Sequence, residues 1–145
     1  MPRALLDVNV LIALLDPDHV FHARAHQWWK GHAKQGWASC PLTENGTVRV
    51  MSNAAYSSAG QWTPSELIRP LDEFSKNSDH EFWPDDVSLR DKTLFLRQYL
   101  HSSRSITDFY LLALATKHRG TLATFDQNIA ISAVHGATDT NLTII

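Results

Sequence analysis

Four acidic side chains of this sequence follow predicted strands or lie at the start of a predicted helix. Three of them follow predicted strands and one opens a predicted helix; they are Asp7, Glu44, Asp126 and Asp108. Carboxylate oxygens, with no cysteine and no need for histidine, are the donors that hard cations such as Mg²⁺ and Mn²⁺ prefer. If the four acids meet, they could hold one or two such ions, and a site of that kind can activate a water to break a phosphodiester bond.

Each acid, taken singly, also has a local structural explanation. Asp7 and Asp126 are short acids that can cap free backbone N–H groups. Glu44 would favour the positive end of its helix, and Ser105 with Asp108 has the spacing of a capping box. A shared site therefore requires a fold that brings the acids together. Unpaired carboxylates in one cleft would then repel one another and raise some pKa values until protons or cations bind.

The elements that must position these acids alternate between strands and helices. Apolar runs predict strands at residues 3–8, 37–40, 80–83, 121–125 and 142–145. Helical spacing and capping signals predict helices at 9–15, 19–34, 42–52, 63–74, 88–100 and 106–118, with a loop at 53–61. Strands joined by helical crossovers are parallel, so their carboxyl ends share one edge of the sheet. We therefore expect the acids at that edge.

Composition limits the classes of protein to which the chain can belong. Its 145 residues suit one domain, with 43% apolar and 19% charged residues. The single cysteine, Cys40, excludes an internal disulfide and any cysteine-based zinc cluster. The net charge of −2 means that a nucleic-acid role would need a local basic patch or bound cations. No long apolar run or signal-peptide pattern is found, so we expect a cytoplasmic protein without membrane contact.

The segments around the four acids resemble the PIN-domain family. LLDVNVLIAL at residues 5–14 resembles its opening motif, and PLTENG at 41–46, with VRV at 48–50, resembles the second motif of the VapC-type toxin branch. ITD at 106–108, followed by LLALA at 111–115, resembles the third motif, and GTLATFD at 120–126 resembles the fourth. The four motifs occur in the family's order. Residues 53–103 match no motif.

The resemblance implies a single PIN domain over residues 1–145 and a three-layer α/β fold, with a central parallel sheet of four to five strands flanked by helices. It implies a metal-dependent endoribonuclease, the toxin of a toxin–antitoxin pair, using one or two Mg²⁺ or Mn²⁺ ions. Asp7, Glu44, Asp108 and Asp126 would be the catalytic, metal-binding acids. A homodimer and inhibition by a small antitoxin protein are also implied. Family members often carry a further acid or glycine after the fourth acid, whereas Gln127 follows here.

Polar residues beside the acids are candidates for orienting a carboxylate or a metal-bound water. They are Asn9, Thr107, Thr124 and Asn128. Asn9 and Thr107 can equally be explained as residues of a helix start, and Thr124 is open to the same pair of explanations.

Other residue types with possible chemistry are explained more simply by structure. His19, His22 and His26 could share one helix face and bind a transition metal, but a solvated face is the simpler explanation. Among the tryptophans, Trp62 in its polar loop is the best candidate for stacking on an RNA base, and packing explains the others. The arginines are scattered singly, which favours surface charges over a phosphate site; those considered are Arg49, Arg69, Arg90, Arg97 and Arg104.

Two other functions fit parts of the pattern. A phosphatase of the haloacid dehalogenase type also begins with a strand-terminal Asp, but it would carry a second Asp where Asn9 stands, and Asp85 and Asp86 lie in a loop instead of following a strand. A non-catalytic PIN-like module that binds RNA or a protein would be expected to lose some of the acids, and all four are present. Metal-dependent turnover separates the enzyme from the binding module.

Overall fold

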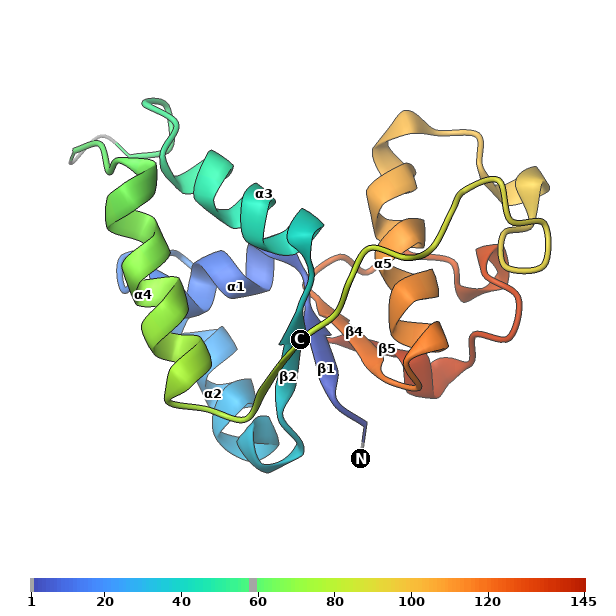
Figure 1. The fold of residues 1–145 in the computed structure, drawn as a ribbon, viewed down its shortest axis with the longest axis horizontal. Helices are drawn as coiled ribbons and strands as arrows, with labels where there is room; N and C mark the ends of the chain where they lie inside the picture. The colour runs from blue at the N-terminus through green and yellow to red at the C-terminus, as the bar shows by residue number, and fades with distance from the viewer. Residues whose placement is uncertain (1, 58–59) are drawn as a thin grey trace.

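The computed structural model describes residues 2–57 and 60–145, and these form a five-stranded parallel sheet in the order β3-β2-β1-β4-β5 (Figure 1). The strands are β1 (Ala4–Leu6), β2 (Trp37–Ser39), β3 (His80–Phe82), β4 (Thr121–Thr124) and β5 (Leu142–Ile144). The helices are α1 (Val8–Leu15), α2 (His22–His32), α3 (Pro41–Met51), α4 (Pro64–Lys76) and α5 (Ile106–Lys117). The predicted α/β fold with a parallel sheet is confirmed.

Alternating strand residues build two cores, one on each face of the sheet. Leu5 and Leu122 pack into the core that contains α5, whereas Leu6 and Ala123 pack into the core that contains α1. Figure 1 shows the same division, with α1 to α4 on one side of the strands and α5 on the other. Successive strand side chains point to opposite faces, so strands this short can be apolar throughout and still serve both cores. Within the described residues, no helix has the length and apolarity needed to span a bilayer.

Two helix predictions need correction, and local side-chain hydrogen bonds explain both. The helix predicted at 19–34 begins only at His22, because Asp16 and His19 accept hydrogen bonds from backbone N–H groups two residues later and hold a turn. The helix predicted at 88–100 is wrong. The Asp91 side chain accepts the backbone N–H of Thr93, and the Asp91 backbone oxygen closes a single turn by accepting from residues 94 and 95. The segment then pairs with residues 133–135 through Leu96 N–H and the Leu94 backbone oxygen instead of continuing as a helix. Only a short 3₁₀ turn at Arg97–Tyr99 remains.

The remaining predicted elements form within a few residues of their expected ends. Thr63 caps α4 by accepting the backbone N–H of Glu66, as its sequence predicts. The predicted loop at 53–61 is irregular where it is described, and residues 58–59 of that prediction lie outside the described residues.

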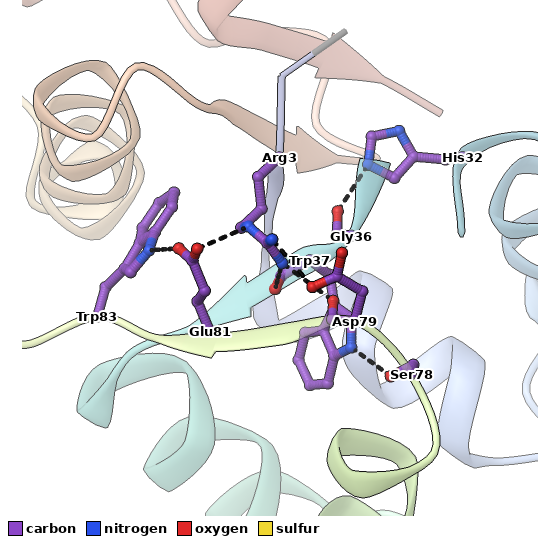
Figure 2. A network of polar contacts seen from close by, with 8 residues as sticks. All are labelled: Arg3, His32, Gly36, Trp37, Ser78, Asp79, Glu81 and Trp83. Atoms are coloured by element: carbon purple, nitrogen blue, oxygen red, sulfur yellow. Dashed lines mark hydrogen bonds and ion pairs between the residues drawn. The ribbon is translucent and has the colours of Figure 1, made fainter. Parts of the chain in front are cut away.

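Arg3 fastens the edge strand β3 to the centre of the sheet at the end opposite to the strand-terminal acids. Its guanidinium donates hydrogen bonds to the backbone oxygens of Trp37 and Asp79 at 3.1 and 3.0 Å, and it pairs with the carboxylates of Asp79 and Glu81 at 2.9 and 3.3 Å (Figure 2). A Cβ at Gly36, where φ is 77°, would lie 2.3 Å from this guanidinium. Gly36 is therefore required both by its backbone angle and by the close approach of Arg3.

Candidate active site

Asp7 lies at the carboxyl end of β1 and caps the amino end of α1. Its Oδ1 accepts a hydrogen bond from the backbone N–H of Val8 at 2.8 Å, and its Oδ2 accepts one from the Thr124 hydroxyl at 2.7 Å. Asp7 and Thr124 are both buried. The helix-cap explanation of Asp7 is correct, but it accounts for only one of the two carboxylate oxygens.

Thr124, at the end of β4, connects Asp7 with Asp126. While its hydroxyl donates to Asp7, its oxygen accepts the backbone N–H of Asp126 at 3.1 Å. Asp126 Oδ1 accepts the backbone N–H of Asn128 at 2.8 Å, which holds the loop after β4 in a tight turn. Because β1 and β4 are adjacent parallel strands, these contacts bring two acids that are distant in the sequence to one edge of the sheet.

Asp108 lies in the first turn of α5 and is the third acid at this edge. Ser105, the residue before α5, has helical backbone angles and makes no capping bond with its side chain, so the capping box considered for Asp108 does not form. Burial raises the pKa of Asp108 to about 7, and the carboxylates of Asp7 and Asp126 add to this effect. The charge of Asp108 is therefore poorly compensated.

The pKa of Asp7 is raised as well. Burial is the main cause, and the charge of Asp126 contributes, whereas the hydrogen bonds from Thr124 and Val8 lower it. The like-charge repulsion expected from the sequence is thus present among three acids. A proton or a cation would relieve it.

Glu44, in the first turn of α3, lines other cavities than the three aspartates do. Its Oε2 accepts a hydrogen bond from the hydroxyl of Ser39 at 2.5 Å, and its side chain lines grooves along α4 with Ile68 and Leu71. In the part of the chain that the structure describes, no three Asp, Glu, His or Cys side chains converge tightly enough to hold one ion in this conformation. The structure therefore makes electrostatic neighbours of Asp7, Asp108 and Asp126, and Glu44 is not among them.

Two cavities adjoin the aspartates, and Asp108 lies in the wall of both. The first, of about 350 Å³, is lined by Ser102, Arg104, Ser105, Asp108, Phe109, Asp126, Asn128 and Ile129. The second, of about 410 Å³, is lined by Asp7, Val8, Asn9, Ile12, His19, Val50, Tyr56 and Asp108. Arg104 is exposed, as the sequence predicts for a surface charge, and it also lines the first cavity together with Asp108 and Asp126.

The polar neighbours predicted from the sequence differ in where they lie. Thr124 contacts Asp7 and Asp126, and Asn128 lines the first cavity. Asn9 lines the second cavity, and its buried Oδ1 has no hydrogen-bond partner among the described residues. Thr107 is exposed and lines neither cavity.

The donor set fits a hard divalent cation. Three carboxylates supply negatively charged oxygens, and the unpartnered Asn9 Oδ1 is a further oxygen in the same wall as Asp7 and Asp108. Mg²⁺ is commonly bound by one or two carboxylates while it keeps several waters, so this arrangement does not require all the acids to touch one ion.

The histidine and tryptophan candidates take structural roles. His22 Nδ1 and His26 Nε2 lie 2.7 and 3.2 Å from the backbone oxygens of Ala13 and Leu14, so each ring has a nitrogen committed to α1. Trp62 is partly buried and packs against the cluster that contains Ile12, so it is less exposed than its polar loop suggests.

A comparison with models of protein families finds a match over most of the chain. The family model of the PIN domain matches residues 4–134, a span that holds the four predicted acids. The chain belongs to the PIN-domain family.

Curated relatives place this PIN domain in the VapC branch. Ribonuclease VapC44 of Mycobacterium tuberculosis is 49% identical over 143 residues, which are 97% of each chain. Ribonuclease VapC39 of the same organism is 44% identical over 133 residues, 92% of this chain and 95% of the relative. Ribonuclease VapC38 is 40% identical over 126 residues, 87% of this chain and 86% of the relative.

Proposed function

We propose that this PIN domain, spanning residues 1–145, is a metal-dependent endoribonuclease and the toxin of a toxin–antitoxin pair. The relatives are named as ribonucleases, which supports RNA as the substrate. The observation that carries the proposal is the group of three aspartates at the carboxyl edge of the sheet, where the pKa of Asp108 is raised to about 7. Such a group is poorly compensated until a cation binds.

In this mechanism, Asp7, Asp108 and Asp126 would hold one or two Mg²⁺ or Mn²⁺ ions, with Glu44 as a further metal-binding acid. The bound metal would lower the pKa of a water and stabilise the leaving oxygen of the phosphodiester. Thr124 keeps Asp7 Oδ2 in place through the 2.7 Å hydrogen bond. Asn9 and Asn128 offer side-chain amides that can orient a metal-bound water.

Arg104 is the residue that we assign to the RNA backbone. It lies in the wall of the cavity that holds Asp108 and Asp126, and a guanidinium pairs well with phosphate oxygens. The positive charge of Arg104 also helps a chain with a net charge of −2 to accept a polyanion. Bound metal would supply the remaining positive charge.

The partners proposed for the protein are RNA, a small antitoxin and a second copy of the chain, acting in the cytoplasm. These proposals rest on the resemblance to VapC toxins. Gel filtration with light scattering measures the dimer, and co-expression with the product of an adjacent small open reading frame tests the antitoxin by restored growth and a co-purifying complex.

The decisive experiment is cleavage of end-labelled structured RNAs by antitoxin-free protein, with Mg²⁺ or Mn²⁺ and with chelator. Asp108→Asn is compared with Asp139→Asn, a matched change at an exposed acid outside the site. Cleavage that needs metal, is lost in Asp108→Asn and persists in Asp139→Asn supports the proposal. RNA binding without cleavage under every metal would replace it with a non-catalytic RNA-binding module.

A further inference from the structure

Ser39 ends β2 with its side chain fully buried between two polar partners from different elements. Its hydroxyl oxygen lies 2.5 Å from Glu44 Oε2 on α3 and 2.8 Å from His80 Nε2 on β3. The exposed fraction of Ser39 is 0%. An RNA phosphate cannot reach a hydroxyl that is so enclosed, so Ser39 is not a nucleophile.

The donors in this chain of hydrogen bonds can be assigned from valence alone. Ser39 has one hydroxyl hydrogen, and it donates that hydrogen to Glu44 Oε2. The Ser39 hydrogen therefore points to Glu44, and His80 Nε2 must carry the hydrogen that binds the Ser39 oxygen. The order of donation is His80 to Ser39 to Glu44.

His80 is held in place from several sides. Its ring lies 4.3 Å from the ring of Trp37, whose indole N–H donates to the Ser78 hydroxyl at 2.8 Å. Arg3 pairs with Asp79 and Glu81, the residues immediately before and after His80 (Figure 2). The imidazole is therefore a fixed donor, because both its ring and its strand are anchored.

Only one carboxylate oxygen of Glu44 takes part in the hydrogen bonds with Ser39 and His80. Oε2 accepts from Ser39, whereas Oε1 has no hydrogen-bond partner among the residues that the structure describes. A carboxylate fixed through one oxygen keeps the other free for a ligand, and groups that hold metal-binding carboxylates in this way strongly affect metal affinity.

We propose that Ser39 and His80 are positioning residues for Glu44: together they fix Oε2 and leave Oε1 available to a divalent cation or to its bound water. This inference rests on the proposed function, since it gives Glu44 a part in metal binding from a position outside the group of three aspartates. It explains why a buried serine and a histidine from the edge strand converge on that one carboxylate.

The test measures Mn²⁺ affinity of the full chain, by electron paramagnetic resonance of the free ion, with unfolding in chelator measured alongside. His80→Phe keeps an aromatic ring but loses the donor, and His80→Gln keeps an N–H donor at the end of the side chain. Ser39→Ala breaks the same chain at a second point, and His135→Phe, at an exposed histidine, is the control. His80→Phe and Ser39→Ala should weaken Mn²⁺ binding about 10-fold or more, whereas His80→Gln should recover most of the affinity.

A double-mutant cycle with Glu44→Gln separates positioning from general structural damage. If His80 acts through Glu44, His80→Phe has little further effect on Mn²⁺ affinity in the Glu44→Gln background. Additive losses in the two backgrounds would overturn the inference, and so would unchanged Mn²⁺ affinity in Ser39→Ala. The readout is metal binding and does not depend on RNA cleavage. A wild-type protein that binds Mn²⁺ but does not cleave RNA would refute the nuclease proposal, and the variants would still test the positioning role of Ser39 and His80. A wild type without measurable Mn²⁺ binding would overturn the positioning role.

Discussion

Replacing Asp108 by Asn should stabilise the metal-free protein above neutral pH while it removes nuclease activity. Folding raises the pKa of Asp108 from 3.8 to about 7, mainly by burial and then through the charges of Asp7 and Asp126. A carboxyl with a raised pKa in the folded state contributes stability that is fully present below its unfolded pKa and is lost as the pH rises through the folded pKa. The window for this loss runs from about pH 4 to pH 7. Asn carries no charge, so the variant avoids the loss.

The expected size of the effect follows from the same values. Each pKa unit corresponds to about 1.4 kcal/mol, so the full difference would be about 4 kcal/mol. Asp108 is only about half-buried, and water screens much of its charge. We therefore expect Asp108→Asn to gain about 1–2 kcal/mol in the free energy of unfolding at pH 8.5, equivalent to about 3–8 °C in Tm for a chain of this length.

The assay is urea unfolding in chelator at pH 5.5 and pH 8.5, for wild type, Asp108→Asn and the surface control Asp139→Asn. The gain of Asp108→Asn over wild type should be larger at pH 8.5 than at pH 5.5, and the control should show no such dependence. Saturating Mn²⁺ should reverse the order, because a ligand at 100 times its Kd adds about 2.7 kcal/mol to a protein that binds it. Equal differences at the two pH values, or a variant that is less stable at pH 8.5, would refute the electrostatic reasoning.

Three further substitutions test other parts of the structure. Thr124→Val keeps the shape but removes the hydroxyl that binds Asp7, so RNA cleavage or Mn²⁺ affinity should fall about 10- to 100-fold; unchanged kinetics and metal titration would exclude this role. Gly46→Ala places a Cβ 2.8 Å from a Val8 methyl, so urea unfolding should show a loss of about 1–3 kcal/mol, whereas helix propensity alone predicts a gain. Arg3→Ala removes the clamp on β3 and should cost about 1–3 kcal/mol in the same assay; a loss below about 0.5 kcal/mol would show that the clamp is dispensable.

The sequence was most informative where local patterns and tertiary packing agree. The run at residues 4–6 is apolar on both strand faces, and the structure buries it between two cores. Thr63 caps α4 as its spacing with Glu66 predicts. The helix prediction was wrong at residues 88–100. The apolar residues there have helical spacing, but they belong to an irregular segment that packs against the core. The Asp91 side chain accepts the backbone N–H of Thr93 and so holds a turn. Phe95 forms a β-bridge with Val134, a residue distant in the sequence that no local pattern reveals.

The sequence by itself determined which acids end strands or open helices, because the change from apolar runs to helical spacing depends only on neighbouring residues. Only the tertiary structure decided how those acids are used. The order of strands places Asp7 beside Asp126, and the burial of Asp108 against both raises its pKa to about 7. The same structure ties Glu44 to Ser39 through a hydrogen bond, and it places Arg104 in the wall of the cavity that Asp108 and Asp126 line. Side-chain direction, burial and charge coupling are set by contacts between residues far apart in the chain, and these appear only once the chain has folded.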